Sequence, residues 1–236
     1  MSGAFRAVIF DFFGTLTEAV SRGRAHELIA QRLGCSPAAF TRALDQTFRA
    51  RSVGGLGQPA DALATVARLA GARPSRSTLD AVLADRVDAV RADTRLRPDA
   101  EPVLAALGRF GFRTAIISDC GPELPEIMPA LPIAPYVDAC VYSIEAGCRK
   151  PDPAIYFAAC DRIGVEPRDC LYVGDGGSQE LSGATAVGMT AVRLTAPDLG
   201  GHLVFDFDEG WSGERIDSLT DVFDALYAHR RARVPA

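Results

Sequence analysis

The chain has 236 residues, of which 48% are hydrophobic and 23% charged, and it carries a formal net charge of -5 at pH 7. This length and composition predict a globular protein with a substantial buried core. The acidic balance, without a basic run, argues against a protein that follows the phosphate backbone of a nucleic acid.

The first predicted element is a strand over residues 7–10, a short continuous apolar run that Asp11 and the turn-forming Gly14 stop. Such a run is typical of a buried parallel strand whose carboxyl end carries the acid. Similar apolar runs follow at residues 114–117, 139–142, 170–173 and 190–194. Helical patterns lie between them, at residues 100–110, 153–163 and 180–187. This alternation predicts an α/β fold with a doubly wound parallel sheet, in which ligands bind outside the carboxyl ends of the strands.

The segment from residue 17 to residue 95 interrupts this alternation. It has a helical periodicity rich in Ala, Leu and Arg, a loop over residues 52–59 and no convincing strand. We therefore predict an α-helical cap over residues 17–95. This cap would be inserted into a Rossmann-like core formed by residues 1–16 and 96–236.

The ends of the chain and its cysteines carry no sign of export. The N-terminus leads directly into a strand rather than through a signal peptide, and no apolar stretch is long enough to cross a bilayer. The C-terminal part is expected to hold a loop over residues 206–213 and a last helix over residues 216–231. Six scattered cysteines, without a Cys-x-x-Cys pair, indicate neither a zinc site nor a disulfide framework. We therefore expect a cytoplasmic protein with reduced thiols and no membrane contact, and the sequence carries no signal for an oligomeric state.

Polar residues follow the predicted strands in four places. They are the segment from Asp11 to Thr17, Ser118, the run Lys150-Pro151-Asp152-Pro153, and Gly174-Asp175 with Glu180 after it. One acid after a strand is a weak signal, because such residues often only cap a helix. In order, polarity and spacing, however, the four together resemble the four motifs of the haloacid dehalogenase (HAD) superfamily over nearly the whole chain. The resemblance implies a hydrolase with a Rossmann-like core and a helical cap.

The resemblance also implies a role for each catalytic residue. Asp11 would be the nucleophile, because a carboxylate can split a difficult displacement into two steps through a covalent intermediate. Lys150 would neutralise charge on Asp11 and on the substrate, while the hydroxyl groups of Thr15 and Ser118 would donate hydrogen bonds to the transferred group. The expected substrate is a small molecule, a phosphorylated metabolite.

A Mg²⁺ site is implied in the same way. Its ligands would be the carboxylates of Asp11 and Asp175 and the backbone carbonyl of Phe13, since Mg²⁺ is a hard cation that prefers oxygen ligands and retains several waters. Glu180, five residues after Asp175, would either orient the metal waters or bind the metal directly.

Phe13 departs from the pattern of the phosphatases in this superfamily. Those enzymes normally have a second aspartate two residues after the nucleophile, which acts as general acid and then as general base. A phenylalanine side chain can do neither, so proton-transfer catalysis should fall about a hundred- to ten-thousand-fold unless the leaving group needs no acid. The metal site is retained, because position 13 contributes its backbone oxygen.

An aromatic residue at position 13 is also a feature of the 2-haloacid dehalogenases of the superfamily, which have a tyrosine there and expel a halide without a proton. Tyr156, six residues after Lys150, and Arg42, in the block where those enzymes have a substrate-receiving arginine, add to the likeness. Their fourth motif lacks Gly174-Asp175, however, and they work without metal. We therefore favour a Mg²⁺-dependent phosphatase. The alternatives are halide displacement from a 2-haloacid and a catalytically impaired protein that binds a phosphometabolite.

The three histidines, His26, His202 and His229, show no pairing with a carboxylate or a nucleophile in the sequence. We therefore do not expect a histidine-based triad. The nucleophilic role is assigned to a carboxylate instead.

Overall fold

The structure, a computed structural model, describes residues 5–233, and for residues 229–233 it describes the backbone alone. Within this range six parallel strands form one sheet in the order β3-β2-β1-β4-β5-β6. They are β1 (Ala7–Phe10), β2 (Arg113–Ser118), β3 (Ala139–Tyr142), β4 (Cys170–Gly174), β5 (Thr190–Leu194) and β6 (Glu214–Ile216). Every residue of β1 is buried, which explains its continuous apolar run. The predicted doubly wound parallel α/β fold is confirmed.

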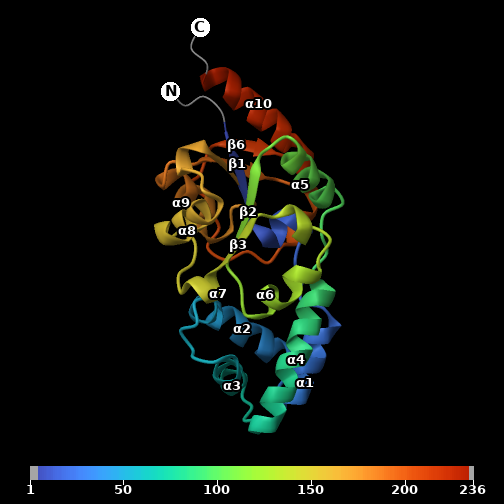
Figure 1. Cartoon of the computed structure of the whole chain (residues 1–236). Coiled ribbons are helices and arrows are strands. Elements are labelled where there is room, and N and C mark those ends of the chain that lie inside the picture. Colours follow the sequence, from blue (N-terminus) through green and yellow to red (C-terminus); the bar gives the residue numbers. More distant parts are fainter. Residues whose placement is uncertain (1–4, 234–236) are drawn as a thin grey trace.

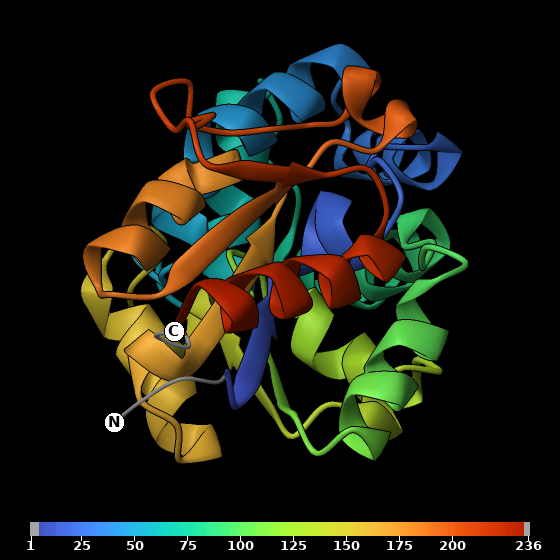
Figure 2. The same cartoon turned by 90° about the horizontal axis from the view of Figure 1, so that it is seen from above.

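Helices cover both faces of this sheet (Figure 1, Figure 2). One face packs against α5 (Ala100–Arg109) and α10 (Val222–Arg233). The other packs against α8 (Pro153–Ile163) and α9 (Glu180–Ala186). Two short helices, α6 (Glu123–Ile127) and α7 (Ser143–Ala146), follow β2 and β3.

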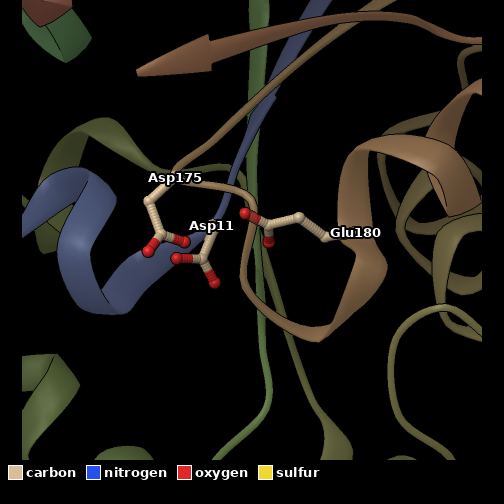
Figure 3. A group of neighbouring side chains, drawn as sticks. All are labelled: Asp11, Asp175 and Glu180. Carbon is tan, nitrogen blue, oxygen red and sulfur yellow. The ribbon is translucent and has the colours of Figure 1, made fainter. Parts of the chain in front are cut away.

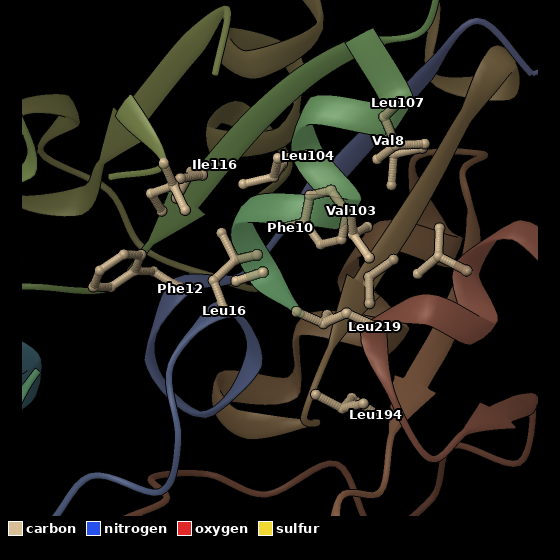
Figure 4. Close-up of a cluster of buried hydrophobic side chains, with 14 of the residues drawn as sticks. Val8, Phe10, Phe12, Leu16, Val103, Leu104, Leu107, Ile116, Leu194 and Leu219 are labelled. Atoms are coloured by element: carbon tan, nitrogen blue, oxygen red, sulfur yellow. The ribbon is translucent and has the colours of Figure 1, made fainter. Parts of the chain in front are cut away.

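The two faces of the sheet carry separate hydrophobic cores. Phe10 belongs to the core under α5, together with Leu104 and Leu107 (Figure 4). Ile9, the preceding residue, belongs to the core under α8, together with Tyr156. Successive side chains of a strand point to opposite faces, so the four residues of β1 contribute to both cores and sit at the centre of the molecule.

Four helices form a separate layer, which we call the helical cap layer. They are α1 (Arg24–Leu33), α2 (Pro37–Arg51), α3 (Pro59–Leu69) and α4 (Arg76–Asp93). Their apolar faces enclose a third core that includes Ile29, Phe40, Leu63 and Val82. Figure 1 shows this layer beyond the carboxyl ends of the strands, at the opposite end of the molecule from α10. Across the described residues, no helix combines the length and apolarity needed to span a bilayer.

The chain leaves the sheet layer and returns to it at one place. Thr17 and Leu96 form an antiparallel bridge, and the backbone N–H of Glu18 donates to the carbonyl of Arg95 at 2.8 Å. The N–H of Arg97 in turn donates to the carbonyl of Leu16 at 2.9 Å. The two connections between the layers therefore run side by side, which restricts how the layers can move relative to each other.

One predicted element at the C-terminus is wrong. Residues Glu214–Ile216 form β6, paired in parallel with β5, and α10 begins only at Val222 instead of at residue 216. Glu214 and Arg215 are exposed on this edge strand, so no apolar run marks it in the sequence. Its pairing with β5 is a tertiary effect that a local pattern does not report.

The strand order creates a switch point beside β1. Its neighbours are β2 on one side and β4 on the other, so the chain connections diverge there. Ligands of open parallel sheets bind in the crevice at such a point, outside the carboxyl ends of the strands. Asp11 directly follows β1, and Asp175 directly follows β4.

Candidate active site

The loop after β1 holds Asp11 in a defined position. Its backbone N–H donates to the carbonyl of Val173 in β4 at 2.9 Å. The loop then turns at Gly14, whose φ of 83° suits glycine, and the Gly14 N–H donates to the Thr17 hydroxyl at 2.9 Å. A Cβ atom at Gly14 would collide with the ring of His202, so this turn also needs glycine for space.

Lys150 lies between two carboxylates. Its Nζ is 2.5 Å from Oδ1 of Asp11 and 2.5 Å from Oε2 of Glu180, and its backbone N–H donates to Asp119 at 3.0 Å. The residue is only 2% exposed. Burial acts to lower the pKa of Lys150, but the charges of Asp11 and Glu180 outweigh it and hold that pKa well above its usual value. The ammonium group is therefore charged.

Three buried acids gather around this lysine. Figure 3 shows the carboxylates of Asp11, Asp175 and Glu180 pointing toward one another, and one oxygen atom of each lies within 4.8 Å of the others. Burial and the neighbouring carboxylates raise the pKa of Asp11 to about 7, of Asp175 to about 6 and of Glu180 to about 7. One ammonium group faces three carboxylates, so a cation bound among them would relieve an excess of buried negative charge.

The carboxylate of Glu180 is already satisfied by protein donors. Oε1 accepts the backbone N–H of Gly176 at 3.0 Å, and Oε2 accepts the hydroxyl of Tyr172 at 2.8 Å as well as the ammonium group of Lys150. This arrangement holds Lys150 against Asp11. A metal could use Glu180 as a ligand only by competing with these bonds, whereas an outer role through water would leave them intact.

The predicted hydroxyl donors are buried and unpaired. Oγ1 of Thr15 and Oγ of Ser118 have no hydrogen-bond partner with acceptable geometry among the described residues, and both side chains are fully buried. The polar neighbour of Ser118 is the thiol of Cys120, a weak hydrogen-bonding group. Buried hydroxyl groups are normally paired, so these two are suited to a ligand at the ends of β1 and β2.

His202, which the sequence did not single out, lies in the same site. Its Nδ1 accepts the backbone N–H of Val20 at 2.8 Å, and its Nε2 lies 3.5 Å from Oδ2 of Asp175. Burial lowers the pKa of His202, while the charge of Asp11 and the backbone of Phe13 act in the opposite direction. Because Nδ1 accepts a backbone N–H, the hydrogen atom of the ring is on Nε2, the atom that faces Asp175. His202 belongs to the long connection between β5 and β6, which carries no recognisable motif.

The other two histidines are His26 and His229. His26 of α1 also contacts a carboxylate, with Nδ1 3.0 Å from Oδ2 of Asp93, although this pair is in the helical cap layer. The side chain of His229 lies outside the described residues. Two histidines thus have acidic partners that their sequence positions do not reveal, but neither carboxylate accepts a hydrogen bond from a hydroxyl or thiol group among the described residues.

A cavity of about 170 Å³ connects the two layers. The core contributes Asp11, Phe13, Lys150, Asp175 and His202, among other residues. The helical cap layer contributes apolar side chains and three arginines, namely Leu44, Phe48, Val90, Arg22, Arg51 and Arg86. The end of the cavity near the sheet is thus acidic and could hold a metal ion. The end in the helical cap layer carries guanidinium groups.

Two residues that suggested a dehalogenase do not occupy substrate-contacting positions. Arg42 is exposed on α2 and does not line the cavity, so it is not placed to receive a substrate there. Tyr156 is fully buried; its hydroxyl donates to the backbone carbonyl of Glu180 at 2.9 Å and its ring packs on Tyr172. It supports the position of Glu180 from the core.

The chain is similar to both phosphatases and dehalogenases. Glyceraldehyde 3-phosphate phosphatase of Methanopyrus kandleri is 33% identical over 128 residues, which cover 54% of this chain and 55% of the phosphatase. (S)-2-haloacid dehalogenase 4A of Burkholderia cepacia is 33% identical over 113 residues, which cover 48% of either protein. The chain thus spans about half the length of these curated relatives.

A solved structure has a similar fold over nearly the whole chain. The L-2-haloacid dehalogenase of Xanthobacter autotrophicus, solved with chloropropionic acid covalently bound, superposes with a TM-score of 0.66 over 94% of this chain and 98% of its own. At 17% identity this likeness shows the fold alone. A family model described as haloacid dehalogenase-like hydrolase, in contrast, matches residues 5–188, which is most of the sequence. The chain therefore belongs to the haloacid dehalogenase-like hydrolases.

Proposed function

We propose that this hydrolase is a Mg²⁺-dependent phosphatase that acts on a small phosphorylated metabolite. The observation that carries the proposal is the group of three buried carboxylates, Asp11, Asp175 and Glu180, around the single ammonium group of Lys150. This group needs a further positive charge, and it faces a cavity large enough for a small molecule.

Asp11 is the nucleophile in this proposal. Its free carboxylate oxygen attacks the phosphorus atom, the bond from phosphorus to the ester oxygen breaks, and an aspartyl-phosphate forms. Water then attacks the same phosphorus, releases inorganic phosphate and regenerates Asp11. Lys150 balances the charge of the nucleophile and of the phosphoryl oxygens, and the hydroxyl groups of Thr15 and Ser118 donate to those oxygens.

Asp11, the backbone carbonyl of Phe13 and Asp175 would hold the Mg²⁺ ion, which would supply the charge that neutralises the phosphate group. Glu180 would act on the outer side, by holding Lys150 and orienting water. His202 would donate a hydrogen bond at the side of Asp175 and limit the positions of that carboxylate.

Phe13 sets the leaving-group requirement. Its side chain lines the cavity, and its edge-to-face contact with Phe12 has a centroid distance of 4.9 Å. No acid stands at this position, so an alkoxide would have to leave without a proton and a good leaving group is favoured.

Residues 17–95 are proposed to act as a cap that excludes water and selects the substrate. Several contacts join this layer to the core near the cavity, and two of them involve side chains that line it. Arg86 of α4 pairs with Glu123 of α6 at 2.6 Å, and Phe48 of α2 stacks on Phe205 with a centroid distance of 4.2 Å. These contacts would stabilise a closed arrangement.

Dehalogenation of a 2-haloacid is the second candidate, because the aromatic Phe13 lines the cavity and a halide leaves without a proton. In that reaction the Asp11 carboxylate would attack the carbon atom, the carbon–halogen bond would break, and water would hydrolyse the ester. The similarity to (S)-2-haloacid dehalogenase 4A supports it. The clustered acids and the exposed position of Arg42 speak for the phosphatase.

A substrate panel tests the two reactions against each other. Mg²⁺-dependent hydrolysis of p-nitrophenyl phosphate is the expected result, with loss of turnover in EDTA and in Asp11→Asn. Asp161→Asn, which alters an exposed acid on α8, is the matched control and should retain activity. Halide release from 2-chloropropionate in EDTA would instead support the dehalogenase. Saturable binding of phosphate esters with neither activity would indicate the catalytically impaired protein.

A further inference from the structure

The end of the cavity in the helical cap layer is lined by three arginines from different segments. Arg22 precedes α1, Arg51 ends α2 and Arg86 lies in the middle of α4. The carboxylates that line this end are Asp93 and Glu123. Asp93 is engaged by His26 at 3.0 Å and by the backbone N–H of Gly23 at 3.0 Å. The three guanidinium groups therefore share few acidic partners.

Arg86 is only partly satisfied. Its Nε and Nη2 atoms both bond to Oε1 of Glu123, each at 2.6 Å, which joins α4 to α6. Its Nη1 atom is buried and has no partner among the described residues, although the whole residue is 8% exposed. A buried donor without an acceptor is costly. An acceptor supplied by a ligand in the cavity would remove that cost.

Arg51 has no acidic partner of its own. Its Nε donates to the hydroxyl of Thr47 at 3.0 Å and its Nη2 to the carbonyl of Leu44 at 3.0 Å, both within α2. No carboxylate of the described chain forms an ion pair with it. Burial and the charge of Arg86 lower the pKa of Arg51 to about 10, so the group remains charged at neutral pH. Two neutral partners fix its orientation, and the charges of Glu123 and Asp45 act on it without a direct ion pair.

Arg22 completes the group from the third side. Its one close ion pair is with Asp45 at 2.6 Å, and Asp45 does not line the cavity. Its charge acts in the same direction as that of Arg86 on the pKa of Arg51, which places the three guanidinium groups within electrostatic reach of one another. Charges of one sign held together in a partly dry cavity are stabilised by a bound ion of opposite sign.

We propose that Arg51, Arg86 and Arg22 form an anion subsite that binds a second acidic group of the substrate, away from the group attacked by Asp11. This inference rests on the proposed phosphatase function and gives its substrate class: a phosphomonoester that also bears a carboxylate or a second phosphate. Both groups present oxygen atoms that match the forked donors of a guanidinium group. Arg51 is the principal specificity residue, because no carboxylate among the described residues forms an ion pair with it and its hydrogen bonds go to neutral groups.

A structural role alone accounts for only part of this cluster. The pair of Arg86 and Glu123 joins the two layers and would do so without any ligand. Arg51 and Arg22, however, make no contact with a carboxylate of the core, and Arg51 bonds only to its own helix. Glu123 of α6 attracts Arg51 without a direct ion pair, so the position of Arg51 on the cavity wall is not explained by a contact that attaches the cap.

Binding of stable phosphonates tests the subsite without turnover. The probes are ω-phosphonocarboxylates with one to four methylene groups, their terminal amides as uncharged equivalents, and the matching bisphosphonates. Affinities are measured by calorimetry with Mg²⁺ present. At least one charged probe should bind the wild-type protein about ten- to a hundred-fold more tightly than its amide. The carboxylate and bisphosphonate series show which second anion is preferred.

Two arginines of the same helix provide the variant and its control. Arg51→Met should abolish the advantage of the charged probe, whereas Arg42→Met, at the exposed position of α2, should retain it. If Arg51→Met does not fold, the same affinities are measured for Arg51→Gln, which keeps a donor for Thr47 and should also lose the advantage of the charged probe. An advantage that is absent from the wild type, or that survives in the Arg51 variants, overturns the subsite. Failure of the phosphatase function would appear separately, as no turnover of p-nitrophenyl phosphate.

Discussion

Lys150 and Asp11 form a buried ion pair with Nζ and Oδ1 2.5 Å apart, although 139 positions separate them in the chain. The pair joins the loop after β1 to the loop before α8 at the carboxyl edge of the sheet. Glu180 holds the lysine from the opposite side. Asp11 therefore has one carboxylate oxygen, Oδ1, restrained by the lysine.

The Asp11→Asn variant should lose all turnover and retain its fold, because the change removes the nucleophile while nearly preserving side-chain volume. Steady-state rates and thermal melting measure the two outcomes. Residual activity above a few per cent of wild type, after exclusion of contaminating enzyme, would contradict the assignment of the nucleophile.

The Asp175→Ala variant should weaken the response to Mg²⁺ by about ten- to a hundred-fold and lower kcat, since it removes one proposed oxygen ligand. The measurement is activity as a function of Mg²⁺ concentration. Asp161→Ala, an exposed acid on α8, is the control. Activity that is independent of metal in the wild type would count against the phosphatase and for the dehalogenase.

Stability of the metal-free protein should decrease as the pH rises from about 5 to 8. The pKa values of Asp11, Asp175 and Glu180 are raised to about 7, 6 and 7, so the folded protein keeps protons that the unfolded chain has released. The stabilisation is complete below the ordinary carboxyl pKa and is lost as the pH passes the raised values. Mg²⁺ binds the deprotonated form, so its stabilising effect should be larger at pH 8 than at pH 5.

Melting temperatures with EDTA and with Mg²⁺ across this pH range measure the effect. In Asp175→Asn the dependence on pH should be shallower, because one of the repelling carboxylates is gone. Asp88→Asn, which changes a largely exposed acid on α4, should keep the wild-type slope. A flat metal-free profile in the wild type would show that the three carboxylates do not share charge in the folded protein.

The Phe13→Asp variant should increase kcat/KM for alkyl phosphates by about ten- to a hundred-fold, with a smaller gain for p-nitrophenyl phosphate, whose leaving group needs no proton. In the wild type the second half-reaction lacks a base, so a burst of p-nitrophenol should precede slow steady-state release. Phe13→Asn is the control, because asparagine has nearly the size of aspartate but carries no acid. A folded Phe13→Asp variant with no gain on either ester would mean that Phe13 does not occupy a lost acid–base position.

The fold was accessible from the sequence because its strands are buried on both faces. Three of them, β1, β3 and β5, have the predicted bounds, since each continuous apolar run ends at a polar residue, namely Asp11, Ser143 and Thr195. β6 was missed because two of its three residues are charged and exposed, and only the neighbouring strand defines it.

The site residues likewise divide into those that the sequence predicted and those that it did not. Asp11, Lys150 and Asp175 follow strands or precede a helix in recognisable motifs, so their meeting could be expected from the parallel sheet. His202 and the cavity arginines could not be found in this way, because they come from a loop and from cap helices whose packing decides which side chains face inward. Arg42 and Arg51 lie on the same helix, yet one is exposed and the other lines the cavity.

Lys150 is the only lysine of the 236 residues, since the other 24 of the 25 lysine and arginine residues are arginines. Amine-directed labelling can therefore address a single side chain, besides the terminal amino group, and that side chain is the one beside the proposed nucleophile, Asp11. At 2% exposure it should react slowly in the folded protein and faster when the cavity opens. An isotope-labelled methyl group placed there would give one resonance that reports the state of the active site directly.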